Sequence, residues 1–199
     1  MHPVKTINPM KTHLLLFNTS ALALGLMLSS GCASNPTTCC TLPATADTSA
    51  STTGADAPVK VSLKFVKADS EETAGENGKG ANAVDGDTTT IWHTQWQDAT
   101  PPCPHEITIE LIPPATIKGF TYLPRQDDSE NGTVKDYEFY VSKDGDDFGL
   151  PVAKGTFEAG KDLRTVKFAP QKCRFIRLKA LSEINDGPWT SAAEIGVVQ

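Results

Sequence analysis

Short runs in which apolar and polar residues alternate constrain the fold of this chain more than any other feature. Alternation with a period of two places one side of a strand against a core and the other side in solvent. Turn-forming residues bound these runs, as at 143–146, and no window shows the period of a helix. The runs lie at 59–67, 106–111, 137–142, 165–168 and 175–180. They predict one all-β domain at 58–199, an antiparallel β-sandwich or jelly roll.

The first 31 residues have the composition of a signal peptide. Lys5 and Lys11 precede an apolar run at 14–28 that is too short to span a bilayer comfortably. The run ends in LSSGC, which resembles the bacterial lipobox, where the signal is cut before a cysteine that is then lipidated. We therefore predict lipidation of Cys32 and a stable lipid anchor in a membrane. An ordinary signal peptide with a chance cysteine is the alternative.

The segment that follows the signal is expected to be a tether. Residues 32–57 are rich in Ser, Thr, Ala and Pro and have almost no large apolar side chains, which is typical of disorder. Ala33 after the cysteine resembles lipoproteins sent to the outer membrane, on a face that the sequence does not decide. Without Lys5 and Lys11, 16 of the 18 basic residues remain against 24 acidic ones, a net charge of −8. This charge disfavours nucleic acid and anionic polysaccharide as main partners.

Four cysteines remain besides the one assigned to lipid, and export permits disulfides. Cys103 and Cys173 are candidates for a bridge, because both precede predicted strands. The pair Cys39 and Cys40 lies in the predicted tether. Four cysteines allow three pairings, and the sequence does not choose between them.

The segment 82–96, NAVDGDTTTIWHTQW, concentrates carboxylates, hydroxyls and aromatic rings. Gly86 permits a sharp turn between Asp85 and Asp87. Carboxylate, hydroxyl and backbone oxygens together are the ligand set that Ca²⁺ prefers. The closing glutamate of an EF-hand loop is missing locally, so a glutamate from elsewhere is needed, and Glu194 is the best candidate. A plain Asp-Gly turn is the alternative explanation.

Seven pieces of the sequence occur in the order found in one family. They are SEET (70–73), AVDGDTTTIWHTQW (83–96), PHEITIEL (104–111), GFTYLPRQDDSENG (119–132), YEFYVSKDG (137–145), RFIRLKAL (174–181) and GPWTSAAEI (187–195). The pattern resembles the discoidin, or coagulation factor type C, domain in its family 32 carbohydrate-binding branch, and in particular the N-terminal domain of galactose oxidase. The resemblance covers residues 59–199 and implies an antiparallel jelly roll of about eight strands.

The resemblance also implies one structural Ca²⁺, or Na⁺, which joins an early loop to the last strand. Carried over residue by residue, Asp85 and Glu194 supply carboxylates, and Thr90 supplies its hydroxyl and carbonyl. The backbone carbonyls of three more residues are expected to complete the set, namely Asn82, Asp87 and Ala193.

A sugar has hydroxyls at its edges and apolar C–H patches on its faces. Its site therefore needs charged hydrogen-bonding groups beside an aromatic wall. Galactose-binding members of the family carry such side chains in loops, at positions that six residues here match, namely Glu76, His93, Trp96, Arg125, Asn131 and Trp189. The tryptophans would form the wall, and the other four residues would bond hydroxyls. Acids at 127, 128 and 130 disfavour anionic sugars.

Several of these residues have structural alternatives. Arg125 can form a solvated ion pair with Asp127 or Asp128, which contributes little. His93 can be a core histidine, and Trp96 fits the core and the rim of a site equally well. Two further assignments concern neighbours of the proposed site. Spacing favours Glu76 over Glu72 as the sugar ligand, and Trp92 is assigned to the core.

These features favour a non-catalytic carbohydrate-binding lipoprotein that recognises galactose or N-acetylgalactosamine-type glycans. The alternative is a structural or protein-binding domain of a cell-surface polysaccharide-handling complex. An enzyme is disfavoured because the best acids are assigned to the metal and the motifs G-x-S-x-G, H-E-x-x-H and the P-loop are missing. The domain either serves the cell surface itself or works with a separately encoded glycoside hydrolase.

Overall fold

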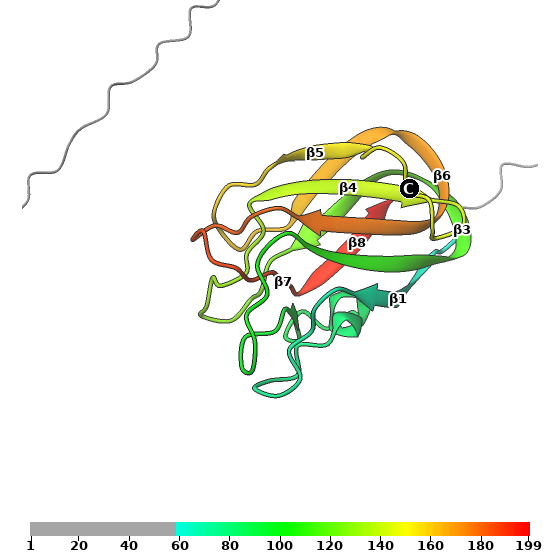
Figure 1. Ribbon diagram of the computed structural model, residues 1–199. Coiled ribbons are helices and arrows are strands. Elements are labelled where there is room, and N and C mark those ends of the chain that lie inside the picture. Colours follow the sequence, from blue (N-terminus) through cyan, green and yellow to red (C-terminus); the bar gives the residue numbers. More distant parts are fainter. Residues whose placement is uncertain (1–58) are drawn as a thin grey trace, which may run out of the picture. The chain divides into compact units, whose positions relative to one another are not determined.

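The computed structural model of the protein describes residues 59–199 (Figure 1). The predicted signal peptide, the tether, Cys32, Cys39 and Cys40 lie outside the described residues. The elements are β1 (Ser62–Ala68), η1 (Gly80–Val84), β2 (Trp92–His93), β3 (His105–Leu123), β4 (Asp136–Ser142), β5 (Ala153–Thr156), β6 (Arg164–Ala180), β7 (Ser191–Ala192) and β8 (Glu194–Val198). Within 59–199 no helix has the length and apolar character needed to span a membrane.

Two long strands, β3 and β6, form the frame of a two-layer sandwich because each takes part in both layers. The first half of β3 pairs with β1 and with the second half of β6, which continues to β4 and then β5. The second half of β3 pairs with the first half of β6 and with β8. These pairings are all antiparallel, and Figure 1 shows both long strands curving round at one end of the domain. The predicted antiparallel β-sandwich is therefore confirmed.

The bend in β3 lies at Pro113 and Pro114, where the register with β6 shifts between Glu110 and Ala115. Proline has no N–H to donate to a ladder, so pairing is interrupted there. The predicted strand at 106–111 is thus only the first half of a longer one. The predicted strands at 165–168 and 175–180 likewise belong to one continuous strand, β6. Local alternation does not reveal this continuity, because the residues at the bend do not alternate.

The core lies between the two layers and is closed by aromatic rings. Phe120 in β3 stacks on Phe139 in β4 with ring centroids 4.0 Å apart, so the two layers meet face to face. Tyr137 stacks on Phe157 at 4.2 Å. Ile107, Ile109 and Leu111 alternate along β3 and are fully buried, as the period-two pattern predicts.

The candidate disulfide does not form, because Cys103 and Cys173 are both free thiols. Cys173 lies within β6 opposite Ala115, at the bend. Cys103 lies near the carbonyl oxygens of Pro188 and Trp189, beyond the start of β3. The length of β3 from 105 to 115 separates the two cysteines. Burial raises the pKa of the Cys173 thiol to about 11.

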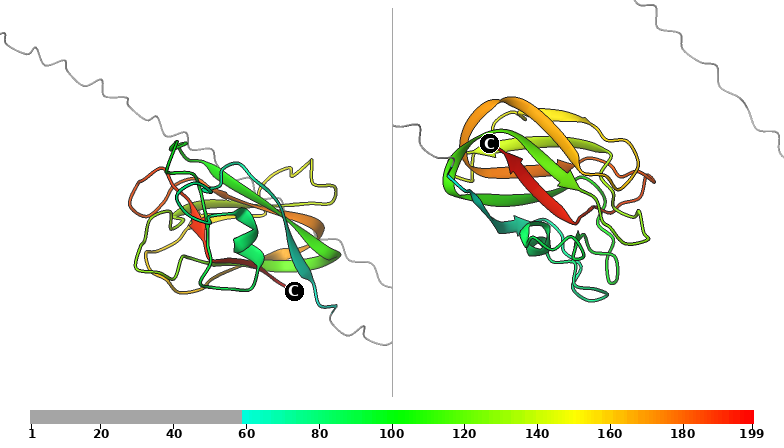
Figure 2. Two further views of the ribbon diagram at one scale, coloured as in Figure 1. Left: turned by 90° about the horizontal axis from the view of Figure 1, so that it is seen from below. Right: turned by 180° about the vertical axis from the view of Figure 1, so that it is seen from behind.

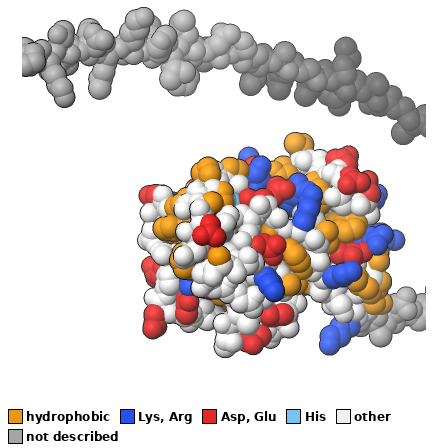
Figure 3. Space-filling model, turned by 60° about the horizontal axis from the view of Figure 1, so that its bottom comes forward, with side chains coloured by type: hydrophobic (Ala, Val, Ile, Leu, Met, Phe, Trp, Pro, Cys, Tyr) orange, Lys and Arg blue, Asp and Glu red, His pale blue; other side chains and the backbone are white. Residues whose placement is uncertain are grey.

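The domain has two distinct ends, which we name the bend end and the loop end. Both described termini lie at the bend end, where the Gln199 side-chain amide donates to the Val59 carbonyl at 3.1 Å (Figures 1 and 2). β1 and the first half of β3 connect this end to the loop end. The loop end carries the connections that follow β1, β3 and β6. Acidic and basic side chains are interspersed on the face drawn in Figure 3, with hydrophobic ones between them.

A buried carboxylate organises the first of these loops. Glu72 is fully buried and accepts four backbone N–H groups through its two oxygens. Ala74 and Gly75 donate to Oε1 at 2.7 and 2.8 Å, and Trp96 and Gln97 donate to Oε2 at 2.7 and 2.8 Å. These bonds, led by those from Gly75 and Trp96, lower the pKa of Glu72 to about 2. One side chain thus ties the loop after β1 to the segment after β2.

The loop before β7 is held in a similar way from two sides. The Glu183 carboxylate accepts the backbone N–H groups of Asn185 and Gly187 at 2.8 and 2.7 Å. Nδ1 of the buried His105 lies 2.7 Å from Asp69, and its Nε2 lies 2.8 Å from the Pro188 carbonyl oxygen. Burial alone would lower the pKa of His105, but the hydrogen bonds to Asp69 and Pro188 outweigh it and raise that pKa. Both ring nitrogens of His105 are thus engaged, and the imidazole anchors the loop to β3.

The role of Glu72 can be tested by Glu72→Gln. A glutamine offers one acceptor oxygen in place of two, so we expect a lower melting temperature at pH 7. The pKa of Glu72 is about 2 in the fold and about 4.3 in an unfolded chain. Its stabilising contribution is therefore present above pH 4.3 and is lost as the pH falls towards 2. Thermal melts across this pH range should show the difference between parent and variant shrinking. A difference that is the same at pH 3 and pH 7 would contradict this role, and the exposed Glu158→Gln serves as control.

Candidate functional site

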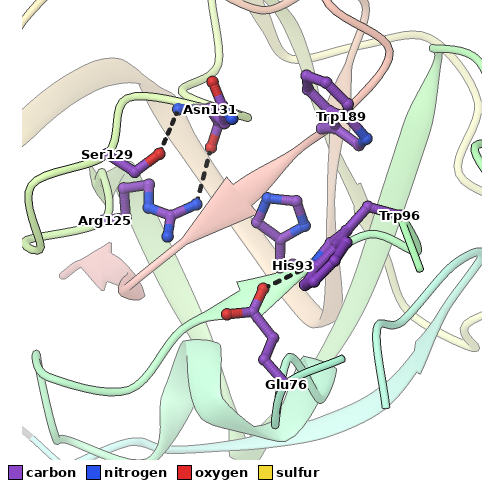
Figure 4. A pocket seen from close by; sticks show the side chains of 7 residues that line it. All are labelled: Glu76, His93, Trp96, Arg125, Ser129, Asn131 and Trp189. Carbon is purple, nitrogen blue, oxygen red and sulfur yellow. Dashed lines mark hydrogen bonds between the residues drawn. The ribbon is translucent and has the colours of Figure 1, made fainter. Parts of the chain in front are cut away.

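A cavity of about 320 Å³ opens at the loop end (Figure 4). Three separate stretches of the chain contribute its walls, at 76–96, 125–131 and 189. We call this cavity the pocket. Its lining residues are Glu76, His93, Trp96, Arg125, Ser129, Asn131 and Trp189. The structure thus brings together all six residues that the sequence suggested for a sugar site. Ser129 was not foreseen, although it lies in the loop between Arg125 and Asn131.

The pairing of β2 with β7 brings two of these walls together. His93 lies opposite Ser191 in a two-stranded antiparallel sheet. Thr94 and Thr190 extend the contact: the Thr94 N–H donates to the Thr190 carbonyl, and the Thr190 N–H donates to the Thr94 hydroxyl, both at 2.9 Å. Trp189 is therefore fixed close to His93, although the two are far apart in the sequence.

Both tryptophans of the pocket lie against glycines. A Cβ on Gly75 would lie 2.5 Å from the Trp96 ring, so only glycine allows this ring to pack so closely. A Cβ on Gly187 would lie 3.0 Å from the Trp189 ring and 2.4 Å from the Glu183 carboxylate. Trp96 remains 38% exposed, which places it at the rim and not in the core. The two rings thus present a fixed apolar surface to the pocket.

Arg125 is buried and is held in position by three hydrogen bonds. Its Nε and Nη2 donate to the Asp127 carboxylate at 2.7 and 2.5 Å, and its Nη1 donates to the Asn131 carbonyl at 3.2 Å. The arginine forms the ion pair that the sequence suggested, and it lines the pocket as well. A guanidinium carries five N–H groups, so these contacts leave one on Nη1 and one on Nη2 for a ligand. The hydrogen bonds and charge of Arg125 lower the pKa of Asp127, which keeps this pair ionised.

The loop that carries Asn131 is anchored through its backbone. The Asn131 carbonyl accepts the Ser191 hydroxyl at 3.0 Å, and the Ser191 N–H donates to the Gly132 carbonyl at 2.7 Å. Behind it, the buried Tyr122 hydroxyl donates to the Ser191 carbonyl at 2.9 Å and accepts the Val134 N–H at 3.0 Å. The Asn131 side-chain amide forms no hydrogen bond with another described residue, so it can donate to a ligand and accept from one.

His93 is buried and presents one ring nitrogen as an acceptor. Nδ1 lies 2.6 Å from the Thr94 carbonyl oxygen. This oxygen can only accept, so Nδ1 carries the proton and Nε2 of the neutral ring has a free lone pair. Burial lowers the pKa of His93 below its ordinary value of 6.5, which favours the neutral ring at pH 7. The suggestion of a purely structural core histidine is therefore too narrow, because this ring also lines the pocket.

Glu76 and Glu72 have different tasks, although they belong to the same loop. Oε1 of Glu76 accepts the indole N–H of Trp96 at 3.0 Å, and the carboxylate faces the pocket. Glu72 is occupied by backbone N–H groups. The structure therefore places Glu76, as the spacing favoured, at the wall of the pocket. Trp92 is 1% exposed and belongs to the core, as predicted.

The residues suggested for a metal gather beside the pocket. The Thr90 hydroxyl lies 2.8 Å from Oδ2 of Asp85 and 3.1 Å from the Asp87 carbonyl. Oε1 of Glu194 accepts the Gly86 N–H at 2.7 Å, across 108 residues of sequence. The last strand therefore meets the 85–90 turn, as expected. Of the two other suggested residues, Asn82 lies in η1, three positions before Asp85, and Ala193 directly precedes Glu194 and β8.

The chemistry of this group fits a hard cation. Burial, together with the charges of Asp85 and Asp87, raises the pKa of Glu194. Within 59–199 neither Asp85 nor Glu194 forms an ion pair with a basic side chain. A cation between them would relieve their repulsion. No group of three or more His, Cys, Asp and Glu side chains converges in the described residues, so backbone and hydroxyl oxygens would have to complete the site.

Comparison with known proteins finds relatives by sequence, and two of them are much longer than this chain. The chain is 38% identical over 135 residues to galactose oxidase of Gibberella zeae, covering 67% of this chain and 19% of that enzyme. It is 40% identical over 136 residues to a sialidase of Micromonospora viridifaciens, covering 68% of this chain and 21% of the sialidase. The chain thus spans about a fifth of the length of these relatives.

Two similar solved structures match over most of their own length. A family 32 carbohydrate-binding module of Clostridium perfringens, in complex with GalNAc-β-1,3-galactose, has a TM-score of 0.63 and 36% identity. The match covers 69% of this chain and 95% of that module. The family 32 module of Clostridium perfringens NanJ, in complex with galactose, has a TM-score of 0.58 and 27% identity, with 69% and 92% covered. The F5/8 type C domain family matches residues 66–195, which is most of the described structure. The chain therefore belongs to the F5/8 type C domain family.

Proposed function

We propose that this domain is a non-catalytic carbohydrate-binding module that recognises galactose-type sugars in the pocket. One observation carries the proposal: hydrogen-bonding side chains and two tryptophans from distant loops line the same cavity. The two similar modules solved with galactose or GalNAc-β-1,3-galactose support it. Binding without catalysis suits a domain that matches only about a fifth of the relatives that are enzymes.

The groups around the pocket complement a sugar. The remaining N–H groups of Arg125 would donate to hydroxyl or ring oxygens, and Nε2 of His93 would accept an axial hydroxyl. The Glu76 carboxylate and the Asn131 amide would bond further hydroxyls. The faces of Trp96 and Trp189 would cover the apolar C–H patch. Because Asp127 already neutralises Arg125, the pocket favours a neutral sugar over an anionic one.

The cation site is proposed as a structural element of the same loops. Asp85, Thr90 and Glu194 would hold Ca²⁺, or Na⁺, with backbone carbonyls of Asn82, Asp87 and Ala193. A bound ion supplies charge that joins the turn at 85–90 to β8 and so stabilises the folded state. The close approach of two carboxylates supports this assignment.

We also propose that lipid on Cys32 anchors the protein to a membrane, as the lipobox and Ala33 suggest for the outer membrane. The first described residue, Val59, lies at the bend end, and the pocket opens at the loop end. The point where the chain enters the described domain and the pocket thus lie at opposite ends of that domain. In this position the domain would hold glycans at the cell surface or present them to a separately encoded glycoside hydrolase.

Sugar binding can be tested with a glycan array, followed by calorimetric titration with galactose. We expect dissociation constants of about 1 mM for galactose and N-acetylgalactosamine, since a small open pocket makes few contacts. Arg125→Ala should weaken binding at least about tenfold, because hydrogen bonds to charged groups contribute about 1.5–3 kcal/mol. Asn131→Ala should also weaken galactose binding. The Asn131 side-chain amide forms no hydrogen bond with another described residue, so the substitution should leave the fold intact.

The control is Arg174→Ala, which removes an exposed arginine that pairs with Glu110. This variant should bind galactose like the parent. An empty array would favour the structural or protein-binding alternative. Equal affinities of the parent, Arg125→Ala and Asn131→Ala would place the sugar elsewhere.

The neutral form of His93 predicts a pH dependence of binding. Burial lowers the pKa of His93 below 6.5, so galactose affinity should be constant above pH 7 and should fall as the pH drops through that lowered pKa. Protonation removes the acceptor at Nε2. Titrations between pH 5 and 8 check this, and His93→Ala should bind weakly at every pH. A His93→Ala variant that binds galactose as tightly as the parent at pH 8 would contradict the assigned acceptor role.

The cation site predicts that EDTA lowers the melting temperature and that Ca²⁺ restores it. Binding to the folded state alone stabilises it by about 2.7 kcal/mol when the ion exceeds its dissociation constant a hundredfold. Glu194→Gln should melt lower than the parent and respond little to Ca²⁺, whereas the exposed Glu158→Gln should respond fully. Identical melts of the parent in EDTA and in Ca²⁺, with Na⁺ held low, would argue against the site.

A further inference from the structure

A second cavity, of about 240 Å³, lies directly beside the pocket, and we call it the side hollow. Its lining residues are Glu76, Asn77, Thr89, Thr90, Ile91 and Asp127. Glu76 lines both cavities, so its side chain forms part of the wall between them. Asp127 of the side hollow also holds Arg125 of the pocket through two hydrogen bonds. The two cavities are therefore connected through Glu76 and through the Arg125–Asp127 pair.

The chain geometry places one lining residue of each cavity close together. Ile91 directly precedes β2, and His93 lies two residues further on. Side chains two residues apart in an extended chain point the same way and are separated by about 7 Å. Ile91 lines the side hollow and His93 lines the pocket. This short separation is suited to two adjacent sugar units of one ligand.

The lining of the side hollow also suits a sugar ring. Ile91 is half-buried and offers an apolar floor. The exposed Asn77 side chain forms no hydrogen bond with another described residue, while its carbonyl oxygen accepts the Asn82 amide at 2.6 Å. Its amide is therefore free to donate and to accept. No lysine or arginine lines the side hollow among the described residues, and the carboxylates of Glu76 and Asp127 would repel an anionic unit.

We propose that the side hollow is a second subsite, which binds the neighbouring unit of a neutral di- or oligosaccharide whose terminal galactose-type sugar occupies the pocket. The inference rests on the proposed function and narrows its ligand from a monosaccharide to an extended neutral glycan. Asn77 bonds hydroxyls of the second unit, and Ile91 contacts its apolar face.

Calorimetric titration of the purified protein tests this with methyl β-galactoside against three neutral disaccharides. These are lactose, galactosyl-β-1,3-GalNAc and GalNAc-β-1,3-galactose. At least one disaccharide should bind about three- to tenfold tighter than methyl β-galactoside, as one or two additional hydrogen bonds would give. Asn77→Ala should remove this gain and leave the affinity for methyl β-galactoside unchanged. Thr88→Ala, an exposed neighbour that does not line the side hollow, should leave both affinities unchanged.

Each of the other outcomes overturns a specific part of the proposal. Equal affinities of the parent for the monosaccharide and all three disaccharides would overturn the second subsite but not the proposed function. A disaccharide gain that survives both Asn77→Ala and Ile91→Ala would place the second unit elsewhere. Failure of the parent to bind methyl β-galactoside or any disaccharide would overturn the proposed function, and the subsite with it.

Discussion

The buried carboxylate of Glu72 is the interaction on which the pocket depends. Loops that build a cavity leave backbone N–H groups without strand partners, and such groups are costly if they are buried unpaired. Glu72 satisfies four of them at once, and they come from both sides of β2. Glu183 satisfies two more in the loop that carries Trp189. These two carboxylates hold the walls in place without a bound ligand.

The balance of charges around the pocket determines which ligands it can accept. Arg125 keeps two N–H groups for a ligand, while Asp127 balances its charge and Asn131 fixes its orientation. His93 is a neutral acceptor because its other nitrogen is engaged. The result is a set of fixed donors and acceptors with little net attraction for an anion. A preformed site of this kind avoids much of the ordering cost of binding, although its small size limits the affinity.

Much of the fold follows from the alternating runs, because burial of one strand face imposes a period of two. The continuity of β3 through Pro113 and Pro114 does not, since no local pattern marks a strand that changes layer. The gathering of the pocket residues came from the order of family motifs; spacing alone does not bring Trp189 beside His93. Spacing favoured Glu76 over Glu72 for the pocket, but the four backbone N–H groups that Glu72 accepts could not be predicted, because they depend on how two loops meet in the fold.

The central claim is that a galactose-type sugar rests against two of the three tryptophans of this chain. Nuclear magnetic resonance of the indole N–H groups during a galactose titration tests it most directly. The signals of Trp96 and Trp189 should shift with the added sugar, and that of Trp92 in the core should not move. Saturating galactose that moves none of the three signals, or moves only that of Trp92, would contradict the account.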